Sequence, residues 1–162
     1  MRILFHSYNT LGAGPAHVTR FILTELSRRQ EKEKTVITVP DLPLFADCRS
    51  TADARVLRLP VLGGVAYYLF RIVYDLLILP VLSVIFNSSA VIVLANYAPM
   101  PLKGKKIVFM RHPFLIDDRD EPRVSARDRI IERLRKMMFQ ITLFSADAVI
   151  VQSHYIKVRL LS

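Results

Sequence analysis

Six short runs, separated by loops or by segments of helical period, constrain the fold of this chain more than any other feature. They are residues 3–5, 36–39, 56–59, 90–94, 107–110 and 148–151, and nearly every position in them is apolar. Strands apolar on both faces belong to parallel sheets that are covered on both sides. Helices that alternate with such strands through right-handed crossovers predict an α/β fold, a Rossmann-like doubly wound parallel sheet.

The 162 residues fit one domain, 1–162, with no clear linker inside it. A helix is predicted to open at Pro15, and a loop with a helical turn is expected at 41–53. Lys103 to Lys106 should form a basic turn. The stripe that should face the sheet on the first helix is Val18, Phe21, Ile22 and Leu26.

A later helix should begin near Ser125, which with Asp128 resembles a helix N-cap pair. Its polar side is strongly basic and contains Arg127, Arg129, Arg133, Arg135 and Lys136. Its core face is predicted to consist of Ile130, Ile131, Leu134, Met137, Met138 and Ile141.

Residues 61–86 are the most apolar stretch of the chain and are numerous enough to span a membrane. Arg71 and Asp75 interrupt the stretch at i,i+4 spacing, which allows them to pair, and Pro80 is expected to break the remainder. We therefore expect a helix half in the core and half in the headgroup region, with a true span as the alternative. The residues expected to contact the membrane are Tyr67, Tyr68, Phe70, Leu76, Leu77, Arg133 and Lys136.

The composition combines apolarity with positive charge: 52% hydrophobic residues, a mean hydropathy of +0.31, a net charge of +9 and a pI of about 10.1. This combination indicates an anionic partner, such as an anionic membrane surface or a phosphorylated small molecule. The alternative is that the charge only keeps the chain soluble. Nucleic acid is not expected as a partner, because the chain lacks a helix-turn-helix pattern and basic residues interleaved with aromatic ones.

Few residue types suited to metal or redox chemistry are present. Cys48 is the single cysteine, so the chain has neither an internal disulfide nor a cysteine zinc site. Four scattered histidines lack metal-ligand spacing, so we expect no metal and no cofactor. The N-terminus lacks a signal-peptide pattern, which favours a cytoplasmic location.

Two segments that follow predicted strands are candidates for binding. The loop after the first strand contains Gly12 and Gly14 and opens a helix, where backbone N–H groups favour a phosphate. It matches neither the dinucleotide-binding fingerprint nor a P-loop, and a simple flexible turn is the alternative. His112 follows the strand at 107–110, at the edge where α/β sheets bind ligands. It is a candidate to hydrogen-bond a sugar or act as a base, with a structural strand cap as the alternative.

Neighbouring charged and polar residues extend these candidates. Arg111 could add a positive charge for a phosphate beside His112, although a solvated arginine is the alternative. His17 lies early in the first helix and His6 ends the first strand. Both histidines are lesser candidates, for which a solvated surface role is expected.

Three segments together resemble glycosyltransferases of the GT-B fold, in particular the retaining family 4. They are Met1-Arg2-Ile3-Leu4-Phe5-His6-Ser7 with the loop from Thr10 to Pro15, then Lys106-Ile107-Val108-Phe109-Met110-Arg111-His112-Pro113, and finally Ala146-Asp147-Ala148-Val149-Ile150-Val151-Gln152-Ser153. The resemblance covers the chain as the first, acceptor-side domain of that fold. It implies that Gly12 and Gly14 lie near the donor diphosphate, that His112 contacts the transferred sugar and that Ser153 lines the cleft.

The resemblance also has departures. The three matched segments do not include the family's second domain, which carries an acidic pair, E-x7-E, and Gly-Ala-Gly-Pro replaces the common Gly-Gly pair in the first loop. We therefore expect an incomplete enzyme, inactive alone, that needs a second domain or subunit to hold the nucleotide-sugar donor.

The expected function is transfer of a sugar to a lipid-linked or polysaccharide acceptor at the cytoplasmic membrane face, with the chain peripherally attached there. The alternative is a non-catalytic membrane-associated subunit that recruits a separate donor-binding protein.

Overall fold

The sheet is all-parallel and has six strands in the order β3-β2-β1-β4-β5-β6, which confirms the predicted Rossmann-like doubly wound architecture. The structure is a computed structural model that describes residues 1–8, 13–28, 34–51, 53–94, 97–98, 100–110 and 126–161. The strands are β1 (Arg2–His6), β2 (Lys34–Pro40), β3 (Ala54–Leu59), β4 (Ala90–Val93), β5 (Lys105–Met110) and β6 (Ala148–Val151).

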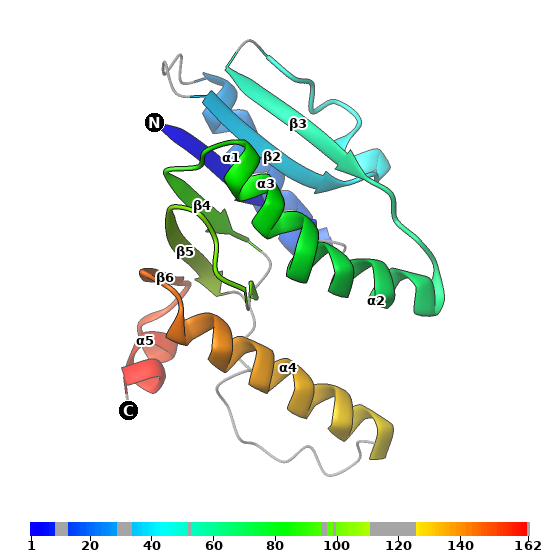
Figure 1. The fold of residues 1–162 in the computed structure, drawn as a ribbon, viewed down its shortest axis with the longest axis vertical. Coiled ribbons are helices and arrows are strands. Elements are labelled where there is room, and N and C mark those ends of the chain that lie inside the picture. Colours follow the sequence, from blue (N-terminus) through cyan, green and yellow to red (C-terminus); the bar gives the residue numbers. More distant parts are fainter. Residues whose placement is uncertain are drawn as a thin grey trace.

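Helices cover both faces of the sheet (Figure 1). One face carries a long helix made of α2 (Gly64–Val73), the π-helical segment η2 (Tyr74–Ile78) and α3 (Leu79–Ile85), and beside it α4 (Ala126–Phe144). We call this the α2–α3 face. The opposite face carries α1 (Ala13–Arg28). The short helix η1 (Pro43–Phe45) and the final helix α5 (His154–Leu161) complete the described elements.

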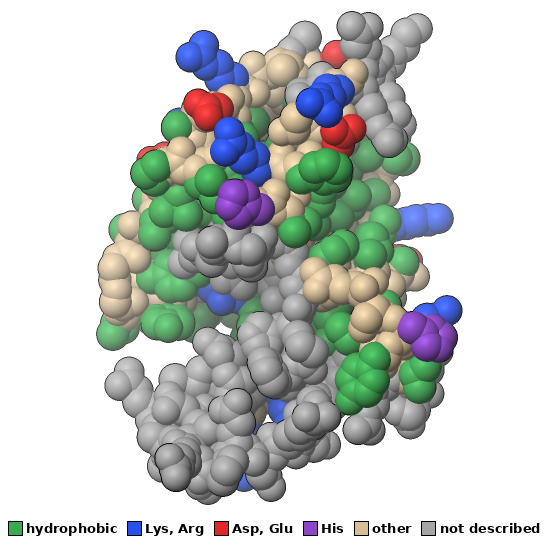
Figure 2. All heavy atoms as spheres, turned by 180° about the vertical axis from the view of Figure 1, so that it is seen from behind, with side chains coloured by type: hydrophobic (Ala, Val, Ile, Leu, Met, Phe, Trp, Pro, Cys, Tyr) green, Lys and Arg blue, Asp and Glu red, His purple; other side chains and the backbone are tan. Residues whose placement is uncertain are grey.

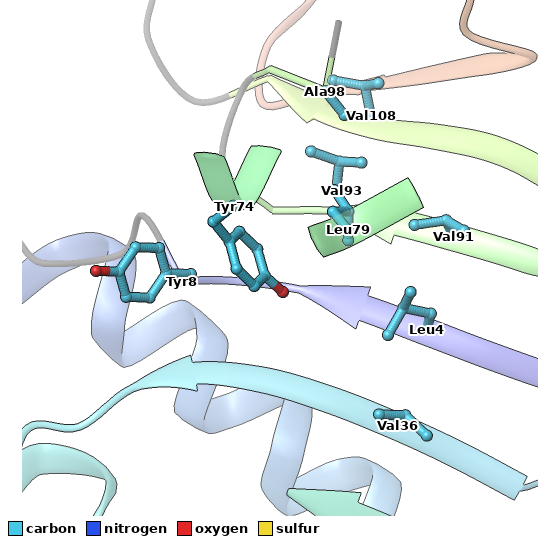
Figure 3. Close-up of a cluster of buried hydrophobic side chains, with 9 residues drawn as sticks. All are labelled: Leu4, Tyr8, Val36, Tyr74, Leu79, Val91, Val93, Ala98 and Val108. Atoms are coloured by element: carbon cyan, nitrogen blue, oxygen red, sulfur yellow. The ribbon is translucent and has the colours of Figure 1, made fainter. Parts of the chain in front are cut away.

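The alternation of side chains along each strand divides the core into two main layers. Leu4, Val36 and Val108 pack with Tyr74 and Leu79 under the α2–α3 face (Figure 3). Their sequence neighbours point the other way: Phe5 and Ile37 pack with Ala16 and Leu23 of α1. Both faces of the central strands are therefore buried, which is why their sequences are apolar at consecutive positions.

Pro80 does not break the helix, contrary to expectation. Residues 64–85 form one continuous helix, in which the N–H of Leu79 bonds to the carbonyl of Tyr74 in the wider π pattern. A π turn just before a proline accommodates the missing N–H, so the helix continues through it.

The predicted stripe of the first helix is only partly correct, since Ile22 packs on the core as expected. Phe21 is 67% exposed, whereas Ala16, Thr19 and Leu23 are buried against the sheet. The small side chains of Ala16 and Thr19 allow the helix to pack closely on the sheet. Apolar residues lie on more than one side of this helix, so periodicity alone could not select the buried side.

The predicted core face of α4 is also only partly correct, since Met138 packs on the core as expected. Leu134, Met137 and Ile141 are exposed, and the buried residues are Phe139 and Thr142. Phe139 packs with Met110 of β5 and with Ile156 of α5. The Thr142 hydroxyl accepts a hydrogen bond from the backbone N–H of Ala98 at 3.0 Å. These two contacts set the rotation of the helix and turn its other apolar stripe outward.

Candidate functional site

The strands that lead into the three segments singled out by the resemblance all end at the carboxyl edge of the sheet. All strands are parallel, so β1, β5 and β6 end at one edge. The segment with Gly12 and Gly14 follows β1, Arg111 and His112 follow β5, and Ser153 follows β6. The chain moves outward from β1 in both directions, to β2 and to β4, so this edge contains a topological switch point, where open α/β sheets bind ligands.

The structure places only some of the predicted site residues. Gly12, Arg111 and His112 lie outside the described residues. Gly14 is in the first turn of α1. His17 lies one turn further along α1 and is exposed, as its solvated role requires.

Ser153 lies directly after β6 and is exposed, and it caps the start of α5. Its hydroxyl oxygen accepts a hydrogen bond from the N–H of Ile156 at 3.3 Å, and its carbonyl accepts one from the N–H of Lys157 at 3.2 Å. This is the pattern of a helix N-cap. The observed contacts of Ser153 therefore explain its presence without a ligand.

His6 is completely buried, so the solvated role expected for it is wrong. It belongs to the same side of β1 as Leu4, because alternate residues of a strand share a face, and this side lies under η2. Its Nε2 atom is 3.3 Å from Oδ1 of Asp75, and its ring stacks on Tyr74 with 5.3 Å between the ring centroids. The histidine thus links the carboxyl end of β1 to the long helix.

Asp75 connects this histidine to a cation on the same helix. Its Oδ2 atom accepts a hydrogen bond from Nε of Arg71 at 3.4 Å, which confirms the predicted i,i+4 pair. The Arg71 guanidinium also lies 4.8 Å from the centroid of the Tyr97 ring. A buried carboxylate is tolerated when charged and polar partners surround it, and Asp75 has Arg71 and His6 on its two oxygens.

Aromatic rings close this cluster from solvent. Tyr8, just past β1, contacts Tyr67, Phe70 and Tyr74 of the long helix at centroid distances of 5.4 to 6.1 Å. In Figure 3 the rings of Tyr8 and Tyr74 lie side by side at the end of β1. The Tyr8 hydroxyl donates to the carbonyl of Pro60 at 2.9 Å. Burial raises the pKa values of both tyrosines, so they are neutral at physiological pH.

The buried cluster of His6, Asp75, Arg71 and the tyrosines is therefore suited to positioning. It holds the long helix against the residue that immediately precedes the candidate loop. His6 and Asp75 are too buried to meet a substrate in this arrangement. The sequence did contain a signal for the pair: a histidine on the Leu4 side of an apolar strand, and one aspartate inside the most apolar segment.

Lys106 is a second buried charge, and the prediction of a basic turn at Lys103–Lys106 missed it. Lys106 lies within β5, and its Nζ donates hydrogen bonds to the carbonyls of Ala98 and Met100 at 2.6 and 2.9 Å and to the Ser145 hydroxyl at 2.7 Å. Burial lowers the pKa of Lys106 to about 8, while the nearby Asp147 acts in the opposite direction. This lysine joins the segment after β4 to the end of α4.

Replacing Lys106 by methionine should destabilise the fold by about 2–4 kcal/mol at pH 7, because the carbonyls of Ala98 and Met100 and the Ser145 hydroxyl lose their charged donor. Between pH 8 and 10.5 the unfolded chain holds the lysine proton more tightly than the folded chain. The stability gained from Lys106 therefore rises with pH in this window. Urea denaturation from pH 7 to 10 measures the difference in the free energy of unfolding between the two proteins. Ionisation of the tyrosines cancels in this difference, because both proteins contain the same tyrosines. A difference independent of pH would contradict the lowered pKa.

The outer side of the long helix is an apolar surface without charge. Arg71 and Asp75 are the two charged residues between Gly64 and Ile85. Arg71 is half-buried and Asp75 is buried, so neither charge lies on the outer side. The helix has 22 residues and is apolar enough to cross a membrane by length and composition, and 22% of its most apolar 18-residue window is buried in the protein. The exposed members of this apolar surface include Val65, Tyr68, Leu69, Ile72, Val73, Leu77, Val81, Val84 and Ile85.

The other residues predicted to touch a membrane divide between two environments. Tyr67, Phe70 and Leu76 are half-buried, and the first two pack on the core. On α4, Arg133 is exposed and Lys136 is half-buried. The same helix exposes the apolar residues Leu134, Met137, Ile141 and Phe144, the last of which is 96% exposed. By contrast, the opposite face has basic and acidic side chains among its apolar ones (Figure 2).

Comparisons with known protein families, with curated proteins and with solved structures find no match to this chain.

Proposed function

We propose that this chain is the acceptor-side domain of a GT-B glycosyltransferase at the cytoplasmic face of a membrane. In this proposal it helps transfer a sugar from a nucleotide-sugar to a lipid-linked or polysaccharide acceptor. The observation that carries the proposal is the common edge reached by β1, β5 and β6, since each leads into one of the three segments that resemble family 4.

The spacing of the strands supports one cleft for these segments. Neighbouring strands lie about 4.8 Å apart, so β1 and β5, with β4 between them, are separated by roughly 10 Å. A sugar phosphate can bridge this distance. The loop after β1 would then approach the phosphate, and His112 after β5 would approach the transferred sugar.

The apolar surface of the long helix supports a membrane location. The inner side of the helix is fixed to the sheet: Tyr74, Leu79 and Ser83 are completely buried, and the Ser83 hydroxyl accepts a hydrogen bond from the N–H of Lys103 at 2.9 Å. A helix held in this way can lie in the plane of a membrane with only its outer side inserted. It also begins at the carboxyl edge of the sheet, which would bring a lipid-linked acceptor close to the cleft.

A second candidate function is that of a non-catalytic membrane-bound subunit that recruits a donor-binding protein. The exposed apolar stripe of α4, from Leu134 to Phe144, favours it, because a partner protein could cover this stripe. Leu134→Ser/Phe144→Ser would then release the donor-binding protein without affecting membrane attachment. If the chain is instead the acceptor-side domain of a glycosyltransferase, the same variant should lower sugar transfer only if this stripe contacts the second domain.

Calorimetry with nucleotide-sugars and acceptors tests the proposed acceptor role. The chain alone should show no micromolar affinity for UDP- or GDP-sugars, because a glycine-containing loop offers backbone donors but no pocket for base and ribose. A short-chain polyprenyl-diphosphate saccharide in mixed micelles should bind, and the same micelles without saccharide are the control. Micromolar binding of a nucleotide-sugar would contradict the need for a second domain, and failure of the saccharide to bind would contradict the acceptor role.

A further inference from the structure

A hollow of about 570 Å³ lies at the amino edge of the sheet, opposite the candidate cleft. It is lined by the first residues of β1, β2 and β3, by the residues before β3 and by the end of α3. Three basic residues, Arg2, Lys34 and Arg55, line it with one acidic residue, Asp53, so its lining has a net charge of +2.

The three basic residues belong to the α2–α3 face. Arg2 shares a side of β1 with Leu4, Lys34 shares a side of β2 with Val36, and Arg55 shares a side of β3 with Leu57. Leu4, Val36 and Leu57 all pack in the core layer under the long helix. The register places Arg2 beside Lys34 and Val36 beside Arg55, so the three cations cluster on adjacent strands.

These cations are available to a ligand. Within the described part of the chain, Lys34 and Arg55 have no ion-pair partner, and both are exposed. Arg2 donates a hydrogen bond to the carbonyl of Phe86 at 3.3 Å, which offsets the negative end of the α3 dipole. In the described part of the chain its guanidinium has no other side-chain hydrogen bond, so the remaining donors can bind an oxyanion.

Ser88 gives an independent indication of a ligand. It is 4% exposed, lines the hollow, and its hydroxyl has no hydrogen-bond partner among the described residues. A buried hydroxyl without a partner is unusual, because its desolvation is not compensated. The backbone of Gly104 packs closely against Ser88. Gly104 has φ +91°, and a Cβ added to it would lie 2.5 Å from the Ser88 carbonyl oxygen, so only glycine fits beside Ser88 at this position.

We propose that this hollow binds the phosphate of an anionic phospholipid headgroup, with the acyl chains lying along α3. Arg2, Lys34 and Arg55 neutralise the phosphate, and the Ser88 hydroxyl donates to it. The apolar surface of α3 ends at the hollow, where Ile85 and Phe86 form part of the lining, so chain and headgroup meet continuous apolar and basic surfaces. The assignment deepens the proposed membrane attachment and rests on it.

Vesicle flotation with the full chain tests the assignment, using phosphatidylcholine vesicles with and without phosphatidic acid. Lys34→Gln/Arg55→Gln should bind phosphatidic acid vesicles roughly 30-fold more weakly, since each basic residue at an anionic surface contributes about fivefold. Binding to neutral vesicles should not change, because the apolar surface is intact. The charge-matched control Arg20→Gln/Lys157→Gln changes residues of α1 and α5 and should weaken binding less than about threefold.

Ser88→Ala separates a built site from general attraction, because it leaves the net charge unchanged. It should weaken binding to phosphatidic acid vesicles roughly three- to tenfold without lowering the melting temperature, since the lost hydroxyl has no partner among the residues that the structure describes. Equal losses in the hollow and control pairs, or no loss in Ser88→Ala, would overturn the site.

NMR titration with sn-glycerol 3-phosphate distinguishes the lipid from a free phosphate. Amide shifts at Lys34 and Ser88 at high ligand concentration, with much tighter binding to vesicles, support the lipid assignment. Equal affinity for glycerol 3-phosphate and vesicles, or titration of the hollow when no vesicles bind, would show a soluble phosphate ligand and overturn the lipid assignment. Vesicle binding that is unchanged by the substitutions in the hollow would leave the proposed membrane attachment intact and would contradict this site.

Discussion

Replacing both Leu69 and Leu77 by glutamate is expected to lower the affinity of the chain for lipid vesicles by roughly 10²–10⁴-fold. The two leucines are 59% and 62% exposed on the outer side of the long helix. Each would contribute about 1.5–3 kcal/mol by leaving water for the membrane interface, and the carboxylates oppose insertion further. Because both side chains are mostly exposed, the fold itself should tolerate the change. Vesicle flotation measures the affinity.

Phe21→Glu/Val158→Glu is the matched control. It introduces the same charge change at two exposed apolar residues of α1 and α5, outside the apolar surface of the long helix. The control should retain most of the wild-type binding. Equal losses in the two pairs would show that charge alone decides attachment, and wild-type binding that survives carbonate extraction would indicate a spanning helix rather than one lying in the plane.

Asp75→Ala is expected to destabilise the fold by about 3–5 kcal/mol, because it leaves a cation and a buried histidine without their common carboxylate. Arg71 would keep its contact with Tyr97, but His6 would lose the oxygen 3.3 Å from its Nε2. Chemical denaturation measures the loss. The long helix should loosen as well, and hydrogen exchange of residues 64–85 should report this.

The surface pair of Arg20 and Asp47 provides the control for this prediction. The two side chains are 3.2 Å apart, but Asp47 is 81% exposed, so Asp47→Ala should cost less than about 1 kcal/mol. Asp75→Asn should fall between the two, since it retains an acceptor and loses the charge. A small loss in Asp75→Ala, similar to that in Asp47→Ala, would show that the buried pair does not hold the helix.

The fold class could be predicted from the sequence because its determinants are local. Residues 3–5, 36–39 and 90–93 are apolar at nearly every position, which only a strand covered on both faces requires, and each lies in an observed strand. The Arg71–Asp75 pair could be predicted for the same reason, since helical geometry alone brings residues four apart together. The position of the candidate cleft stays a prediction, since Gly12, Arg111 and His112 lie outside the described residues.

The tertiary structure decided which side of each element is buried and which distant residues meet. The helical periodicity predicted Phe21 and Leu134 as core residues, but both are exposed, and Leu23 and Phe139 are buried instead. His6 meets Asp75, and Arg2 joins Lys34 and Arg55, only because strand order and register bring segments far apart in the chain together. Periodicity describes one helix or strand at a time. The rotation of a helix on the sheet and the pairing of distant side chains depend on packing between elements, which no local pattern contains.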